Sequence, residues 1–144
     1  MKLKKLSLLG LTAITLSLLP VQGVLAAPHY NCLVTNDGIM PRFNNIQSAS
    51  IGVYPSSTKT EYDLFIMGTS DMTSVSGTST LYKKNASGTF TKIDSETINL
   101  NGSTIRYTGK LKSSGSGTYK ITFSGKVYSK TGSETLTISS QNSY

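Results

Sequence analysis

Residues 119–127 read YKITFSGKV, and their large apolar side chains stand at alternate positions. Tyr119, Ile121, Phe123 and Val127 share one phase, while lysine, threonine and serine fill the other. An apolar period of two residues is typical of a β-strand that buries one face and exposes the other. We therefore expect this stretch to be a strand that packs against a core through its odd-numbered residues.

The same alternation recurs along the chain from residue 46 onward. No stretch places apolar residues at helical spacing, and the outward positions hold serine and threonine, which suit strands better than helices. About seven strands separated by turns predict an all-β fold, an antiparallel immunoglobulin-like β-sandwich. The apolar positions of the other six expected strands lie in residues 51–53, 62–66, 75–81, 90–100, 105–107 and 136–138.

Local signals mark where these strands end or bend. Residues 85–88 and 131–132 have the composition of turns. Asn101-Gly102 stands between two alternating runs and predicts a short hairpin. Phe90 and Ile93 fall out of phase with each other, so we expect a β-bulge between them.

Tyr119 stands near the start of its expected strand, two residues before the inward-facing Ile121. Immunoglobulin-type domains place a corner tyrosine there, and its hydroxyl bonds to the backbone a few residues upstream. Where such domains have a disulfide, the second cysteine takes the place that Ile121 has here. We expect the Tyr119 hydroxyl to bond to the preceding loop; the alternative is an ordinary half-buried tyrosine.

The first 26 residues are typical of a secretory signal peptide. Lys2, Lys4 and Lys5 precede a leucine-rich run, and small residues follow at Ala26 and Ala27. The apolar run is shorter than the roughly 20 residues of helix that cross a bilayer. We therefore expect cleavage after Ala26, or else after Ala27, no membrane anchor, and a secreted, soluble product.

Removal of this leader would leave two parts. Residues 27–43 lack periodicity and are expected to form an irregular N-terminal arm, whereas residues 44–144 form the β-sandwich domain. The arm residues that we expect to pack against the domain are Leu33, Val34, Ile39 and Phe43.

The charge of the secreted part is mildly positive. The chain has 14 Lys and Arg against 7 Asp and Glu, and three of the lysines lie in the leader. The remaining 11 basic and 7 acidic residues give a net charge of +4. This charge favours contact with anionic wall polymers or lipid head groups without requiring it. The lysines are scattered, which argues against a nucleic-acid partner.

Few side chains suit catalysis or metal binding. The only histidine is His29 and the only cysteine is Cys32, and both lie in the arm. Cys32 is expected to be a free thiol or half of an intermolecular disulfide that links a dimer. We expect no enzyme activity, no cofactor and no metal. The carboxylate pairs of the strands, which we expect to face solvent, are Glu61 with Asp63 and Asp94 with Glu96.

Three tyrosines are candidate ligand-contact residues. Tyr54, Tyr82 and Tyr128 fall in the phase opposite to the apolar residues of their strands, so we expect their rings on the outer faces. Exported sandwiches commonly bind sugars by stacking aromatic rings on them. Tyrosine is also frequent in strands for its β propensity alone, and the chain has no tryptophan to strengthen such a platform.

Several short motifs give the chain a resemblance to a known family. They are residues 40–46, 81–84, 88–90, 117–119 and 134–136. At this spacing the chain resembles an uncharacterised family of small proteins secreted by Gram-positive bacteria, catalogued as a domain of unknown function. The resemblance covers nearly the whole secreted part and implies export and a sandwich domain, but no activity and no functional residue. Similar members often have Trp near the position of Phe90.

Together these features predict a small secreted β-sandwich that serves as a non-enzymatic binding or interaction module outside the cell. The expected partner is a cell-wall polymer, a glycan or a protein. Two alternatives stay open. A secreted toxin or antimicrobial effector fits the small size and mild positive charge, and a glycan-binding module fits the three tyrosines.

Overall fold

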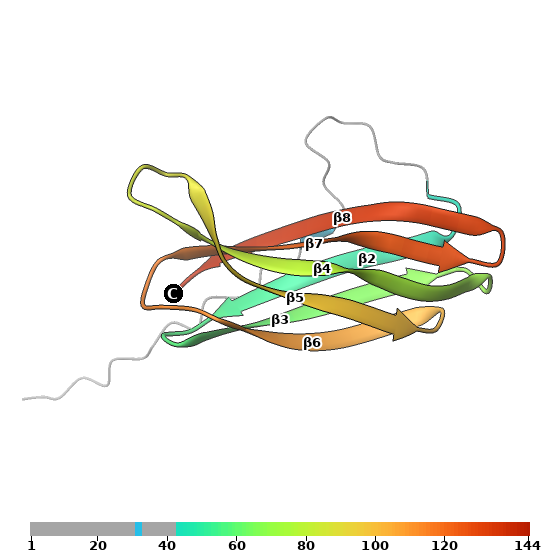
Figure 1. Cartoon of the computed structure of the whole chain (residues 1–144), viewed down its shortest axis with the longest axis horizontal. Helices are drawn as coiled ribbons and strands as arrows, with labels where there is room; N and C mark the ends of the chain where they lie inside the picture. The colour runs from blue at the N-terminus through green and yellow to red at the C-terminus, as the bar shows by residue number, and fades with distance from the viewer. Residues whose placement is uncertain (1–30, 33–42) are drawn as a thin grey trace, which may run out of the picture.

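The computed structural model describes residues 31–32 and 43–144, and every regular element in this part is a β-strand. The strands form two antiparallel sheets, ordered β1-β2-β3-β6 and β5-β4-β7-β8. Figure 1 shows them as two facing layers, so the predicted all-β, two-sheet fold is confirmed. The strands are β1 Asn31–Cys32, β2 Ile46–Pro55, β3 Lys59–Gly68, β4 Met72–Lys84, β5 Phe90–Asn101, β6 Thr104–Lys112, β7 Thr118–Ser129 and β8 Gly132–Ser143.

The N-terminal segment is described only at β1, which pairs with β2, and from Phe43 onward. Phe43 packs against the core, as predicted, whereas Leu33, Val34 and Ile39 lie outside the described residues. The expected leader with its cleavage positions Ala26 and Ala27 lies outside the described residues, and so does His29. Whether the Cys32 thiol is free or bridged stays a prediction.

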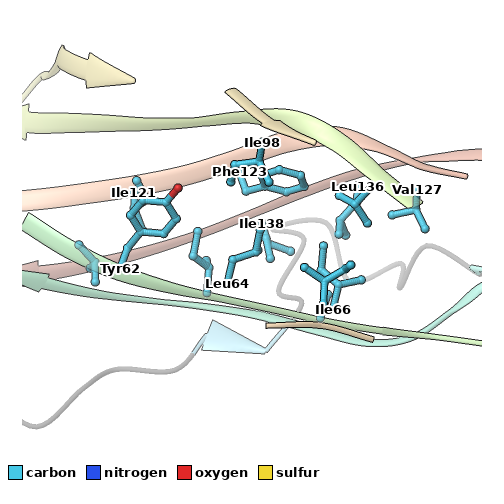
Figure 2. Packing of buried hydrophobic residues seen from close by; sticks show 14 of the residues in the cluster. Tyr62, Leu64, Ile66, Ile98, Ile121, Phe123, Val127, Leu136 and Ile138 are labelled. Carbon is cyan, nitrogen blue, oxygen red and sulfur yellow. The ribbon is translucent and has the colours of Figure 1, made fainter. Parts of the chain in front are cut away.

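The core lies between the sheets and is built from the alternating positions. Tyr62, Leu64 and Ile66 of β3 are at most 1% exposed, and Ile121 and Phe123 of β7 are fully buried. Figure 2 shows these side chains pointing from the two layers toward each other. The period-two pattern therefore identified the buried face of each of these strands correctly.

A pair of glycines brings β4 and β7 close together in the middle of one sheet. Gly77 lies opposite Gly125 in the ladder. A Cβ added to Gly77 would stand 2.7 Å from the Phe123 ring and 2.7 Å from the Gly125 Cα. These two positions stay empty of side chains because the buried Phe123 ring fills the space that they leave.

The expected bulge in β5 is present and it changes which way the strand's side chains point. Lys92 lies opposite Tyr82, and Asp94 lies opposite Leu81, so Ile93 has no partner in β4. Leu81 is buried whereas Tyr82 is partly exposed. One extra residue therefore puts Lys92 on the outer face and Asp94 on the inner face.

The Asn101-Gly102 prediction was wrong in one respect, because the strands that it joins do not pair. β5 pairs with β4 and β6 pairs with β3, so the turn leads from one sheet to the other. Gly102 has φ +131°, which favours glycine. Its N–H donates to the Thr73 carbonyl at 2.8 Å. An Asn-Gly pair favours a tight turn. Which strands pair with each other depends instead on the burial of the side chains along the strands.

The Tyr119 hydroxyl does bond to the preceding loop, as expected. It lies 2.7 Å from the carbonyl oxygen of Gly115 and 2.9 Å from that of Ser114, while the residue is fully buried. A hydroxyl has one proton, so the two carbonyls share it. This contact joins the β6–β7 loop to the start of β7.

Replacement of Tyr119 by Phe should lower the free energy of unfolding by about 1 kcal/mol, because the fully buried side chain loses its hydrogen bond to the Ser114 and Gly115 carbonyls. Urea denaturation measures the change. Tyr128→Phe is the matched control, since Tyr128 is 39% exposed in the same strand. Equal stabilities for the two variants would contradict a corner role for Tyr119.

Candidate functional site

The structure does not bring the three candidate tyrosines together. Tyr54 lies on β2, in the sheet opposite to the one that carries Tyr82 and Tyr128. Tyr82 on β4 and Tyr128 on β7 share an outer face, but Tyr128 is opposite Ser74. Along β4, Ser74 is about 26 Å from Tyr82 at an ordinary strand rise. A single sugar-stacking platform of these residues is therefore not formed.

Tyr82 instead belongs to a cluster of lysines and aromatic rings on the outer face of the β5-β4-β7-β8 sheet. It lies between Lys92 of β5 and Lys120 of β7 in the register. The Lys120 ammonium stands 5.2 Å from the ring centroid of Tyr82 and 4.6 Å from that of Phe90. We call Tyr82, Phe90, Lys92 and Lys120 the cationic patch.

The two rings hold the Lys120 ammonium in place. A cation over an aromatic face is attracted by the ring quadrupole, and such contacts contribute about 0.5–1 kcal/mol at exposed sites. Lys120 is only partly exposed. Its contact with the two rings restricts a side chain that would otherwise sample many rotamers. The patch lies at the base of the β4–β5 hairpin, whose tip stands away from the two layers in Figure 1.

Charges are unevenly distributed between the two outer faces. On the β2-β3-β6 side, Glu61 is bonded to Lys59 at 3.3 Å and to Lys110 at 3.2 Å. Among the described residues, no carboxylate pairs with Lys92 or Lys120. The cationic patch thus presents positive charge that is not neutralised locally.

The bulge in β5 accounts for this separation. The sequence interpretation expected Asp94 and Glu96 to face solvent, and this expectation was wrong. After the extra residue at Ile93, both carboxylates turn toward the other sheet. Asp94 accepts from the Lys112 N–H at 2.7 Å, and Glu96 is partly buried. Without the bulge the two carboxylates would share the outer face with Lys92.

Glu96 joins the sheets through two tyrosines. One of its carboxylate oxygens accepts the Tyr62 hydroxyl at 2.6 Å, and the other accepts the Tyr107 hydroxyl at 3.0 Å. Gly109 leaves room for this contact, because a Cβ there would overlap the Tyr62 ring and the Glu96 carboxylate. Burial, and then the neighbouring Glu96 carboxylate, raise the pKa of Tyr62 and the pKa of Tyr107 above their usual value near 10.0.

Neither this cluster nor the rest of the described chain has the composition of a metal centre. Within residues 31–32 and 43–144, no three His, Cys, Asp or Glu side chains gather closely enough to hold an ion. Nor does that part of the chain include a helix with the length and apolar character that a membrane crossing needs.

The chain matches no protein-family model, and no curated protein resembles it significantly.

Glu96→Gln should reduce the free energy of unfolding by about 1–2 kcal/mol, because charge-assisted hydrogen bonds to two tyrosines become weaker neutral ones. Urea denaturation at neutral pH measures this change. Glu61→Gln is the control, since it removes an exposed carboxylate on the opposite face and should cost less. An equal effect of both substitutions would argue against an inter-sheet role for Glu96.

The raised pKa values also predict how stability depends on pH. Above the usual tyrosine pKa near 10.0, unfolded chains release phenolic protons that Tyr62 and Tyr107 keep in the folded state. The unfolded state then binds fewer protons, so stability is fully present below pH 10 and falls as the pH rises beyond it.

Tyr107→Phe should make the free energy of unfolding fall less steeply above pH 10, because only the Tyr62 hydroxyl of this pair is left to titrate. Urea denaturation at about pH 9 and about pH 11 gives the slope, and Tyr128→Phe serves as the control. A Tyr107→Phe slope as steep as that of the unchanged protein would contradict the assignment.

Proposed function

We propose that this protein is secreted after cleavage of residues 1–26 and binds an anionic extracellular polymer, without catalysis, through the cationic patch. The signal-like leader supports export. The observation that carries the binding proposal is the unneutralised Lys92 and Lys120 beside the rings of Tyr82 and Phe90.

We further propose that the domain is immunoglobulin-like. In strand order, β5 lies beside β4 in the sheet that also contains β7 and β8. The variable type of immunoglobulin domain likewise has an added strand beside the third strand of the domain, in the corresponding sheet. The Tyr119 contact, at the start of the sixth long strand, supports the same assignment.

The chemistry of the patch favours phosphate- or carboxylate-bearing polymers over neutral ones. Lysine ammonium groups attract anions. Where such a group is partly buried against rings, fewer water molecules compete with the anion for it. The neighbouring rings add apolar surface on which a sugar or glycerol backbone can lie. Serine and threonine are frequent on the rest of this face, with Thr80 and Thr122 in the next row of the register. Their hydroxyls offer both hydrogen-bond donors and acceptors.

The substitution Lys120→Gln should weaken binding to poly(glycerol phosphate) by about fivefold, the loss expected for one lysine near an anionic surface. Isothermal titration calorimetry at low salt measures the affinity, and added salt should reduce it. Lys112→Gln removes the same charge from the opposite sheet and should leave the affinity within about twofold.

Two outcomes would overturn this proposal. One is an equal loss of affinity in Lys120→Gln and Lys112→Gln, which would show that only net charge matters. The other is binding to neutral dextran as strong as binding to the phosphate polymer. Phe90→Leu provides a second check, because it removes one ring from Lys120 without changing the charge of the patch.

A further inference from the structure

The outer face of the β2-β3-β6 sheet contains a hollow of about 510 Å³, on the opposite side of the molecule from the cationic patch. This volume is in the range of small-molecule sites. The side chains that border it come from adjacent positions of the three strands. They are Ser50, Asp63, Phe65, Arg106 and Thr108.

The register explains how these side chains come together. Phe65 of β3 lies between Ser50 of β2 and Arg106 of β6. In the next row, Asp63 lies opposite Thr108 and, on its other side, opposite Gly52. Ser50 is small, and the Tyr54 ring lies over Gly52, where an added Cβ would stand 2.9 Å from the Tyr54 hydroxyl oxygen.

One cation and one anion border this hollow without pairing with each other. The Arg106 guanidinium lies 4.6 Å from the Phe65 ring centroid, and among the described residues it forms no ion pair. Asp63 accepts the Thr108 hydroxyl at 2.7 Å through one carboxylate oxygen. Its other oxygen has no partner in the described part of the chain.

The geometry points to a small zwitterion as the ligand, and we propose that the hollow binds an α-amino acid. Arg106 and Asp63 are diagonal neighbours across β3 and β6, which places their Cα atoms about 7–8 Å apart. An amino acid carries an ammonium and a carboxylate one carbon apart. Its carboxylate would accept the forked N–H groups of Arg106, and its ammonium would donate to the free oxygen of Asp63.

The neighbouring groups restrict the ligand further. Thr108 holds one oxygen of Asp63 and so fixes the orientation of the carboxylate. Phe65 supports the guanidinium from one side and leaves its N–H edges for the ligand. The Phe65 edge also offers apolar surface, which favours a short aliphatic side chain. Both charged groups are exposed, so binding should be weak, with a Kd of about 1 mM.

Titration of the ¹⁵N-labelled protein with L-alanine tests the proposal by nuclear magnetic resonance. Acetate and methylamine, each bearing only one of the two charges, are the comparison probes. The amide signals of Asp63, Phe65, Arg106 and Thr108 should shift with alanine in a saturable way. Half of the maximal shift should be reached at an alanine concentration at least about tenfold lower than that of acetate or methylamine.

Substitutions separate the two contacts. Arg106→Gln should abolish the response to both alanine and acetate. Asp63→Asn should keep the acetate response but remove the preference for alanine. Lys110→Gln is the control on the same face, because its ammonium is bonded to Glu61 and does not line the hollow. Unchanged dispersion of the other signals verifies that each variant is folded.

The proposal would be overturned by non-saturating shifts, by an equal response to alanine and acetate, or by an Asp63→Asn variant that still prefers alanine. This result is independent of the polymer-binding proposal. Lys120→Gln should leave the alanine titration unchanged, and Arg106→Gln should leave the binding of poly(glycerol phosphate) within about twofold.

Discussion

The contact of the Glu96 carboxylate with Tyr62 and Tyr107 joins the two sheets at a place where apolar side chains alone do not close the sandwich. Asp94 makes a similar link beside it, to the backbone of Lys112. The carboxylates therefore come from one sheet and their donors from the other. A chain with modest apolar content can hold two sheets together in this way, because each of these carboxylates has a hydrogen-bond donor. Among the described residues, two buried hydroxyls, of Thr60 and Ser79, have no such partner.

The opposite edge of the sandwich is closed by the same principle. Glu134 of β8 accepts the backbone N–H of Asn44 at 2.7 Å and that of Asn45 at 3.2 Å. Asn142, near the end of the same strand, donates to the Val53 carbonyl of β2 at 3.3 Å. These contacts give side-chain partners to backbone groups of β2 and of the residues just before it. At the corners, side chains thus supply the hydrogen-bond partners that neighbouring strands supply within the sheets.

Sequence alone predicted the seven long strands, the buried phases of all of them except β5, the bulge near Ile93 and the Tyr119 contact, because each depends on residues close together in the chain. It did not predict the direction of Glu96, since this requires knowing which residue the bulge leaves unpaired. It also missed the contact of Lys120 with Tyr82 and Phe90, because the pairing of β4 with β7 carries no local signal. The hollow beside Arg106 was missed for the same reason, as it needs the register of three strands.

The turn at Asn101-Gly102 has a consequence for how the chain folds. Three pairings, β2 with β3, β4 with β5 and β7 with β8, join neighbouring segments and can form early. The β3–β6 and β4–β7 ladders must close much longer loops. Because the Asn101-Gly102 turn fixes β6 to the end of the β4–β5 hairpin, docking of that hairpin over β3 delivers β6 to its partner at the same time. Assembly of the first sheet is thereby coupled to docking of the β4–β5 hairpin, which is half of the second sheet.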